Sequence, residues 1–358
     1  MAAKAGQRRA ASRALRALGW FWAVTLLVLA GGAGALQYLG PLHQTAPSAQ
    51  AFVAGAKAYA APTNAAPPTA GLEPAAAAGI IHAPDAALLE SSQTYPGGLL
   101  PRIAADGRTA MAFYAAHAEP ADARPRVALL LSGIGMSETD SMEAIAGTPP
   151  AVSLAISPYA FRPERLLAEA RLAGHETLVS LPLEPDRYPI DDPGNHALLT
   201  GNAPAMNDQR LEWALTRFAG YVGATGALNG MRGERFGAAP ELMAPVLREL
   251  AARGVLYIDP RPVAPPPPFD AGRSVDVVID EPAVRTEIEA NLARLEQVAK
   301  DHGSALGLVG IPRPVTLDRI AAWATTLAAR GFVLVPVSAL VRTPVVAEPR
   351  QTVQKQPG

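Results

Sequence analysis

Alternating strand-like and helix-like segments between residues 126 and 335 constrain the fold of this chain more than any other feature. Short apolar runs of strand length alternate with longer amphipathic segments, and proline or glycine stands near many of the helix starts and ends. This pattern predicts an α/β fold with a parallel sheet, and about seven strand–helix units in roughly 220 residues suit a closed or nearly closed (β/α) barrel. An open, doubly wound sheet would give the same alternation. We expect strands at 126–131, 151–156, 177–181, 223–228, 255–258, 275–279, 306–309 and 332–335.

The N-terminal region predicts attachment to a membrane. A basic segment at 1–17 precedes an uncharged apolar run at 18–39, and about 20 apolar residues can span a bilayer as a helix. Basic residues before such a run favour a cytoplasmic N-terminus, with the rest of the chain in the periplasm or otherwise outside the cytoplasm. Ala33-Gly34-Ala35 leaves open a cleaved signal peptide and a secreted protein.

Residues 40–124 are rich in alanine and proline, which predicts an extended linker between the apolar run and the main domain. Large apolar residues return after residue 80, so the part at 80–124 could dock on the main domain as an arm. We expect the barrel to occupy 125–343 and a disordered tail to follow at 344–358.

Charge and cysteine content exclude several classes of protein. The 31 basic and 32 acidic side chains give no net charge that would favour nucleic acid or an acidic polymer. No cysteine occurs, so disulfides and thiolate metal sites are excluded. The six histidines show no helical pair spaced for metal binding.

Loops that follow the carboxyl ends of barrel strands form the active face of such folds. Three expected loops lie within 129–135, 228–236 and 309–314, and they contain no carboxylate pair, histidine or cysteine beside the single Glu234. The catalytic candidates therefore come from other strand ends. Glu184 lies between Pro182 and Pro185, and Asp259 ends an expected strand just before Arg261. Each could equally be structural, Glu184 by accepting backbone N–H groups and Asp259 by contacting Arg261.

Arginines and neutral polar residues on the same expected face are candidates for ligand binding. If the arginines converge, their forked donors could hold a carboxylate or sugar hydroxyls. Two histidines are weaker candidates, because His175 stands at the amino end of a strand and His196 lies in a polar loop. The binding candidates are Ser132, Asn229, Arg235, Arg261 and Arg313.

Several motifs in a fixed order resemble the divergent polysaccharide deacetylase family over roughly 125–343. Besides the three loops, they include Ala-Gly-His-Glu at 173–176, Leu-Pro-Leu-Glu-Pro at 181–185 and the closing segment at 334–340. The resemblance implies paired aspartates at the positions of Ser132 and Gly133, and histidines at those of Met231 and Ile311. In the family these groups would hold a zinc-type divalent metal and activate water against an N-acetyl group.

None of those four groups is present, so the resemblance predicts the fold without the metal site. We expect a catalytically degenerate envelope protein of carbohydrate metabolism that binds a glycan such as peptidoglycan, or an envelope protein. One alternative is an active carbohydrate deacetylase or hydrolase, either metal-dependent or carboxylate-based, with a site drawn from Glu184, Asp259 and His196. Another is a protein-interaction scaffold in which residues 80–124 matter most.

Overall fold

A computed structural model describes residues 79–341 except 120, 121, 263 and 269, together with Trp20, Trp22 and Thr25. Residues 79–341 belong to a compact unit that spans Glu73–Gly358. The expected tail at 344–358, the linker up to residue 78 and most of the apolar run at 18–39 lie outside the described residues. Among the described residues, no helix combines the length and the apolar character that crossing a membrane requires. The anchor therefore stays a prediction.

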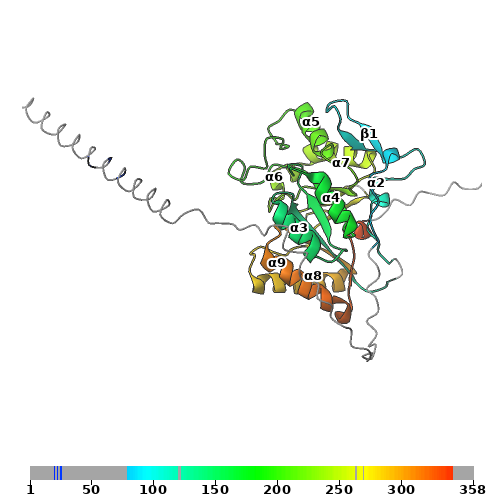
Figure 1. Ribbon diagram of the computed structural model, residues 1–358, viewed down its shortest axis with the longest axis vertical. Helices are drawn as coiled ribbons and strands as arrows, with labels where there is room; N and C mark the ends of the chain where they lie inside the picture. The colour runs from blue at the N-terminus through cyan, green and yellow to red at the C-terminus, as the bar shows by residue number, and fades with distance from the viewer. Residues whose placement is uncertain are drawn as a thin grey trace, which may run out of the picture. The chain divides into compact units, whose positions relative to one another are not determined.

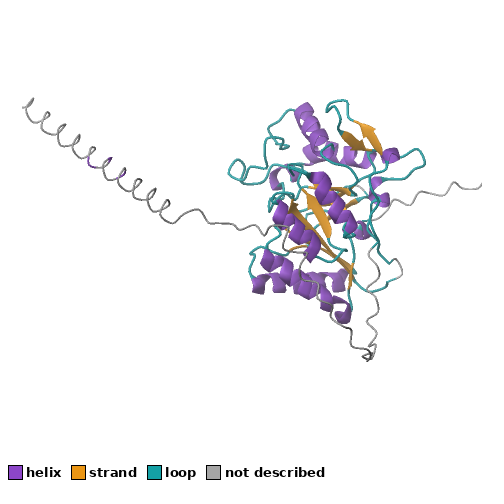
Figure 2. Ribbon diagram, in the orientation of Figure 1, coloured by secondary structure: helices purple, strands orange, loops and turns teal. Residues whose placement is uncertain are grey.

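A parallel sheet of nine strands forms the centre of the domain, with helices packed around it (Figures 1 and 2). The strand order is β8-β7-β6-β5-β4-β3-β10-β9, and β11 pairs with the start of β3. The predicted α/β class with a parallel sheet is confirmed. The strands are β3 (Arg126–Ile134), β4 (Ser153–Ile156), β5 (Thr177–Ser180), β6 (Gly223–Thr225), β7 (Leu256–Asp259), β8 (Gly272–Ser274), β9 (Val277–Val278), β10 (Ser304–Val309) and β11 (Val333–Leu334).

The sheet is a parallel half-barrel, so of the closed or nearly closed barrel that the sequence predicted, full closure is not found in the described part of the chain. Among the described residues β8 and β9 form the two free edges of the sheet and do not pair with each other. Only Val275 and Asp276 separate these two strands in the chain. The two edge strands are thus connected through the chain by these two residues, but no backbone hydrogen bonds pair them as neighbouring strands. β8 was not predicted, because its sequence Gly-Arg-Ser has no apolar pattern.

Proline and glycine mark the helix ends as expected. Proline occupies the first turn of α4, α5, α7 and α9, where its missing N–H costs no helical hydrogen bond. Gly303 ends α8 in the left-handed conformation that glycine adopts without strain. The helices that follow strands in the sheet are α3 (Glu138–Gly147), α4 (Pro163–Leu172), α5 (Pro204–Leu215), α6 (Glu234–Gly237), α7 (Pro240–Ala252), α8 (Arg285–His302) and α9 (Pro314–Leu327), and the short 3-10 helix η3 (Val337–Leu340) follows β11.

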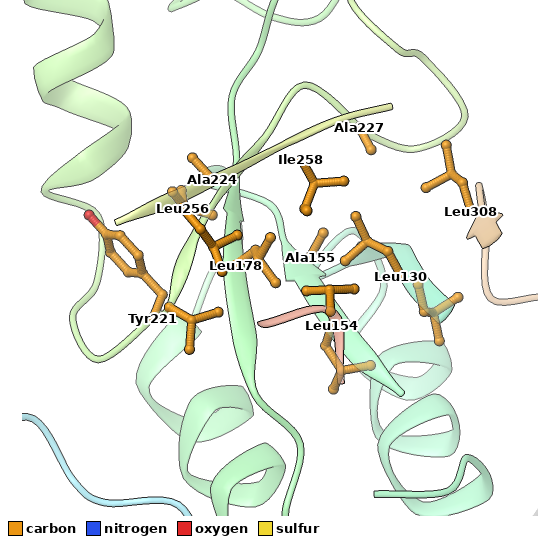
Figure 3. Packing of buried hydrophobic residues seen from close by; sticks show 14 of the residues in the cluster. Leu130, Leu154, Ala155, Leu178, Tyr221, Ala224, Ala227, Leu256, Ile258 and Leu308 are labelled. Carbon is orange, nitrogen blue, oxygen red and sulfur yellow. The ribbon is translucent and has the colours of Figure 1, made fainter. Parts of the chain in front are cut away.

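The central strands are buried along their length, which explains why they read as nearly continuous apolar runs. Leu130, Leu154, Leu178 and Ile258 come from four different strands and lie in one cluster (Figure 3). This core fixes the strands in register, and so it positions their carboxyl ends relative to one another.

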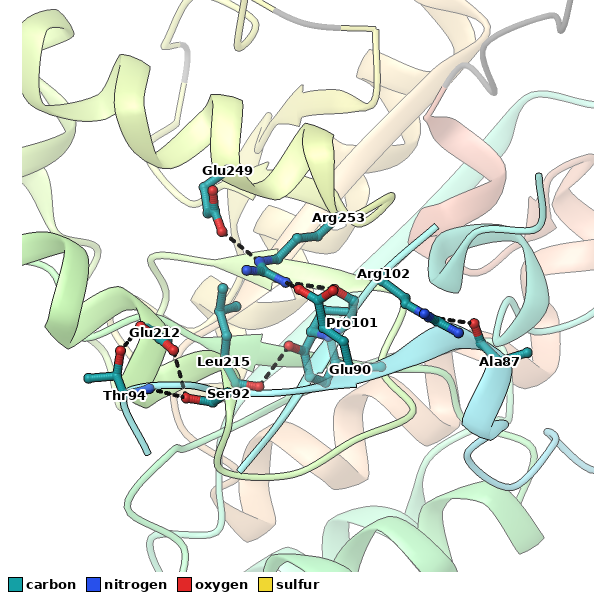
Figure 4. Close-up of polar contacts among 11 residues, drawn as sticks. Ala87, Glu90, Ser92, Thr94, Pro101, Arg102, Glu212, Leu215, Glu249 and Arg253 are labelled. Carbon is teal, nitrogen blue, oxygen red and sulfur yellow. Dashed lines mark hydrogen bonds and ion pairs between the residues drawn. The ribbon is translucent and has the colours of Figure 1, made fainter. Parts of the chain in front are cut away.

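The segment before β3 adds a small hairpin to the domain. Strands β1 (Leu89–Ser91) and β2 (Leu99–Pro101) pair antiparallel, and the helix α2 (Ala110–Phe113) follows them. Glu212 of α5 accepts hydrogen bonds from Ser92 and Thr94, while Arg253 binds Glu90 (Figure 4). Leu88, Leu100 and Tyr114 belong to the main hydrophobic core. Removing this segment would therefore expose core surface, which makes its deletion a poor test of an interaction role.

We expect Leu88→Ala to lower the free energy of unfolding by about 2 to 5 kcal/mol, because a fully buried leucine is replaced by a cavity. Urea unfolding of the full chain measures this loss. Leu99→Ala is the matched control, since Leu99 lies in β2 of the hairpin that directly follows Leu88 but is 41% exposed. Equal losses for the two variants would contradict the packing described for the hairpin.

Candidate functional site

The carboxyl ends of β3, β6 and β10 meet at one edge of the sheet, as the sequence predicted for the site face. β3 and β10 are neighbours in the sheet. The loop after β6 reaches them, because the Cα of Gly230 is 3.3 Å from where a Cβ on Gly310 would lie. Asn229 Oδ1 is 3.6 Å from the corresponding position on Gly133. The four family positions therefore lie close together, Ser132 and Gly133 at the end of β3 and Met231 and Ile311 on the loops after β6 and β10.

Ser132 and Gly133 are enclosed by the loop that follows β10. Ser132 is 1% exposed, and its hydroxyl donates a 2.7 Å hydrogen bond to the carbonyl of Gly310. Gly133 has a φ of 79°, and a Cβ at this position would lie 3.0 Å from Pro312 Cδ. Neither position faces an open space that a pair of carboxylates could use.

A tight turn shapes the loop after β6. Leu228 and Met231 exchange two backbone hydrogen bonds of 2.9 Å, and the residues between them, Asn229 and Gly230, have φ values of 48° and 86°. Two positive φ angles in a row favour an Asn-Gly pair. The Ile311 side chain lies against this turn, since its Cδ1 is 3.7 Å from where a Cβ on Gly230 would be. An aliphatic contact thus occupies one position where the family would have a histidine.

The structure adds Asp280, which the sequence analysis missed. It follows β9, is 2% exposed and accepts hydrogen bonds from the backbone N–H groups of Gly310 (2.8 Å) and Ile311 (3.3 Å). Burial raises the pKa of Asp280, although these N–H groups oppose the shift. Asp280 stands just after the strand expected at 275–279. Asp259 was selected as a candidate because of the same placement, so the sequence could have identified Asp280 as well.

Glu184 joins the loop after β5 to α6. The carboxylate is 4% exposed and accepts hydrogen bonds from the backbone N–H and the hydroxyl of Thr200 and from Arg235 Nη1 at 2.9 Å. Burial acts to raise the pKa of Glu184, but these donors outweigh it and lower the pKa. The predicted structural alternative for Glu184, a carboxylate that accepts backbone N–H groups, describes this geometry.

The lowered pKa gives a pH-dependent prediction. The stabilisation from Glu184 should be complete above its usual pKa of 4.5 and should be lost as the pH falls through the lower folded value. We expect Glu184→Gln to lower the free energy of unfolding at pH 7 by about 2 kcal/mol, and by progressively less in acid. Urea unfolding between pH 3 and pH 7 measures the difference. Glu281→Gln is the control, because Glu281 is 46% exposed in its pair with Arg232.

Asp259 is bound by the residue that the sequence suggested. Its carboxylate is 5% exposed and accepts from the backbone N–H, Nε and Nη2 of Arg261, the last at 2.6 Å. The hydrogen bonds that the Arg261 guanidinium donates to Asp259 are also the main reason that the pKa of Arg261 is raised. The pair lines a cavity of 310 Å³ next to Tyr257 and the prolines at 265–268.

The three candidate arginines have separate partners. Arg235 binds Glu184, Arg261 binds Asp259, and Arg313 lies 3.9 Å from Asp280. Each arginine therefore pairs with a carboxylate near the end of a different strand. These pairings give no support to a single anion site shared by the three arginines.

The two histidines differ in surroundings. His175 is 1% exposed, and its ring nitrogens lie 2.8 and 3.0 Å from the carbonyls of Val152 and Ile145, which suits a structural role. His196 stacks on Trp213 with ring centroids 3.9 Å apart. Burial, with smaller contributions from Arg210 and Arg217, lowers the pKa of His196.

The residues at this edge do not fit a zinc-type metal. In the part of the chain that the structure describes, no three histidine, aspartate or glutamate side chains are grouped so that they could hold a metal ion. Asp280 points its two oxygens at backbone N–H groups, and the hydroxyl of Ser132 is bonded to a carbonyl. We therefore derive no chemical step through a metal.

The fold and this edge define a parallel α/β half-barrel whose loops at the carboxyl ends form the candidate site. Residues 129–341 match the family of divergent polysaccharide deacetylases. This chain belongs to that family, which confirms the resemblance seen in its motifs.

Related proteins are known from several bacteria. An uncharacterized protein of Agrobacterium tumefaciens C58, with a crystal structure, is 32% identical, and the match covers 68% of this chain and 100% of that one with a TM-score of 0.61. An uncharacterized protein of Haemophilus influenzae is 26% identical over 203 residues, which are 54% of this chain and 69% of that protein. The catalytic domain of a peptidoglycan N-acetylglucosamine deacetylase from Eubacterium rectale is 13% identical with a TM-score of 0.37, over 61% of this chain and 90% of that one.

Proposed function

We propose that this chain is a non-hydrolytic member of the divergent polysaccharide deacetylase family that binds a glycan, with peptidoglycan as the first candidate. One observation carries the proposal. The four positions that the family uses for metal and acid–base chemistry hold Ser132, Gly133, Met231 and Ile311, and the loop after β10 packs directly on the first two. A hydrolytic deacetylase needs a metal-bound water at that place.

The geometry gives little support to hydrolysis by Glu184 and Asp259. A carboxylate pair that cleaves a sugar bond needs one member with a raised pKa to act as the acid. The pKa of Glu184 is lowered, and both carboxylates already accept hydrogen bonds from arginine. Binding without turnover is the better account of these residues.

The envelope is the proposed location. The basic segment at 1–17 and the apolar run at 18–39 support export of the main domain, either on an anchor or after signal cleavage. An envelope protein remains the alternative partner, and the experiments below separate it from a glycan.

Incubating the purified protein with peptidoglycan sacculi tests the proposal. We expect the protein to sediment with the sacculi and no acetate to be released, with or without added zinc. Cellulose, which has no N-acetyl groups, is the control polymer. Release of acetate that depends on the protein would contradict the non-hydrolytic reading, and failure to sediment would contradict the glycan as ligand.

A further inference from the structure

An exposed apolar pair stands on the rim of the half-barrel, on the loops that follow β3 and β4. Phe161 is 90% exposed and Met136 is 50% exposed. The two loops touch, because a Cβ on Gly135 would lie 2.6 Å from the Cβ of Ala160. Met136 follows Gly135 and Phe161 follows Ala160, so the two exposed residues are carried by loops that contact each other.

The loop that carries Phe161 is fixed by its neighbours. The carbonyl of Pro158 accepts a 2.9 Å hydrogen bond from Arg217, and the hydroxyl of Tyr159 accepts one of 3.1 Å from the backbone N–H of His196. Ala160 donates its own N–H to Ser157 at 3.1 Å. The phenyl ring is therefore held in solvent by an ordered loop. Burying such a side chain contributes about 1.5 to 3 kcal/mol, and this ring is available to make that contact with a ligand.

Positive charge lies beside this ring. Arg162 and Arg165 share one carboxylate, Glu138, at 2.8 and 2.6 Å. The guanidinium carbon of Arg162 is 5.8 Å from the centre of the Phe161 ring. The two guanidinium groups share this one carboxylate, and the Arg162 side chain is 58% exposed. An anionic group that approached Phe161 would meet a donor that is ready to pair with it.

We propose that Met136, Phe161 and Arg162 form a binding site for an acidic, N-acetylated glycan strand. A sugar ring and its acetyl methyl would pack on Phe161 and Met136, and a carboxylate carried by the strand would pair with Arg162. Peptidoglycan has such carboxylates on its peptide stems, and on those muramic acid residues that carry no stem. This inference rests on the proposed function. It places the contact with the glycan at the rim of the half-barrel and not at the packed strand ends.

Calorimetric titration of the full chain with two soluble ligands tests the site. The acidic ligand is the N-acetylglucosaminyl-N-acetylmuramyl dipeptide, and the neutral one is chitotetraose. We expect Phe161→Ala to weaken binding of both ligands about tenfold, in line with a lost stacking contact. Arg162→Gln should weaken only the acidic ligand. Leu172→Ala is the matched control, because Leu172 is 65% exposed at the far end of α4, about 15 Å away along the helix.

The outcomes separate this inference from the function on which it rests. If the unmodified protein binds the acidic ligand and both rim variants bind it equally well, the rim site is wrong while glycan binding stands. If Arg162→Gln weakens the two ligands equally, the proposed preference for acidic glycans is wrong. If the unmodified protein binds neither ligand, both proposals fail and a protein partner becomes the better reading. Because Phe161 and Arg162 are exposed, thermal unfolding should show all variants folded.

Discussion

Gly133→Asp, which restores one aspartate that the family would have, should destabilise the domain by about 3 kcal/mol or more and should create no metal site. The backbone of Gly133 has a φ of 79°, which costs a non-glycine residue about 1 to 2 kcal/mol. The new Cβ would also lie 3.0 Å from Pro312 Cδ and 3.3 Å from the carbonyl oxygen of Gly310. A carboxylate placed against a carbonyl inside the protein adds a further penalty.

Urea unfolding measures the loss, with Gly201→Asp as the control. Gly201 has ordinary backbone geometry, and a Cβ there would meet no atom within 4 Å. The control should therefore change the free energy of unfolding by less than about 0.5 kcal/mol. A loss below about 1 kcal/mol for Gly133→Asp would mean that the strand ends are open, and the packed-edge account would be wrong.

The second large effect is expected at the opposite end of the sheet, where Glu176→Ala should cost about 3 to 5 kcal/mol. Glu176 is fully buried and accepts hydrogen bonds from Ser153 Oγ (2.7 Å), the backbone N–H of Ala116 (3.1 Å), and the backbone N–H and hydroxyl of Ser338 (3.0 and 2.6 Å). One carboxylate thus joins β4, the segment before β3 and η3. Its removal leaves several buried donors unpaired, each costing about 1 to 3 kcal/mol.

Thermal and urea unfolding of Glu176→Ala measure this effect. Glu143→Ala is the control, because Glu143 is an exposed glutamate on α3. If Glu176→Ala does not fold, Ser338→Ala gives a milder test, since it removes a single hydroxyl donor. Wild-type stability in Glu176→Ala would show that the carboxylate does not hold these segments together.

The sequence predicted the fold best where a local pattern determines the structure. Buried strands such as β3 and β5 read as apolar runs, and proline at position 163 or 240 begins a helix. β8 is a strand only because Gly272–Ser274 pairs with β7, and that pairing leaves no mark on the sequence. The open edge between β8 and β9 could not be predicted for the same reason.

For the site, the sequence predicted a parallel sheet, and hence that the carboxyl ends of its strands would converge. It did not predict which side chains would be hydrogen-bonded to each other there. Glu184 and Arg235 are 51 positions apart, and Ser132 and Gly310 are 178 positions apart. Such pairings depend on the finished fold. Only the pairing of Asp259 with Arg261, two positions apart, was within reach of the sequence. The metal and acid–base positions themselves came from the resemblance to the family.

Calorimetric titration of the full chain with zinc, followed by elemental analysis, tests the non-hydrolytic reading most directly. We predict no saturable heat and no stoichiometric zinc, because the strand ends present backbone groups, Ile311 and Pro312 where the family would place ligands. One tightly held zinc per chain that is lost in Asp280→Asn would contradict the account, since it would place a working metal centre at the edge that we describe as packed.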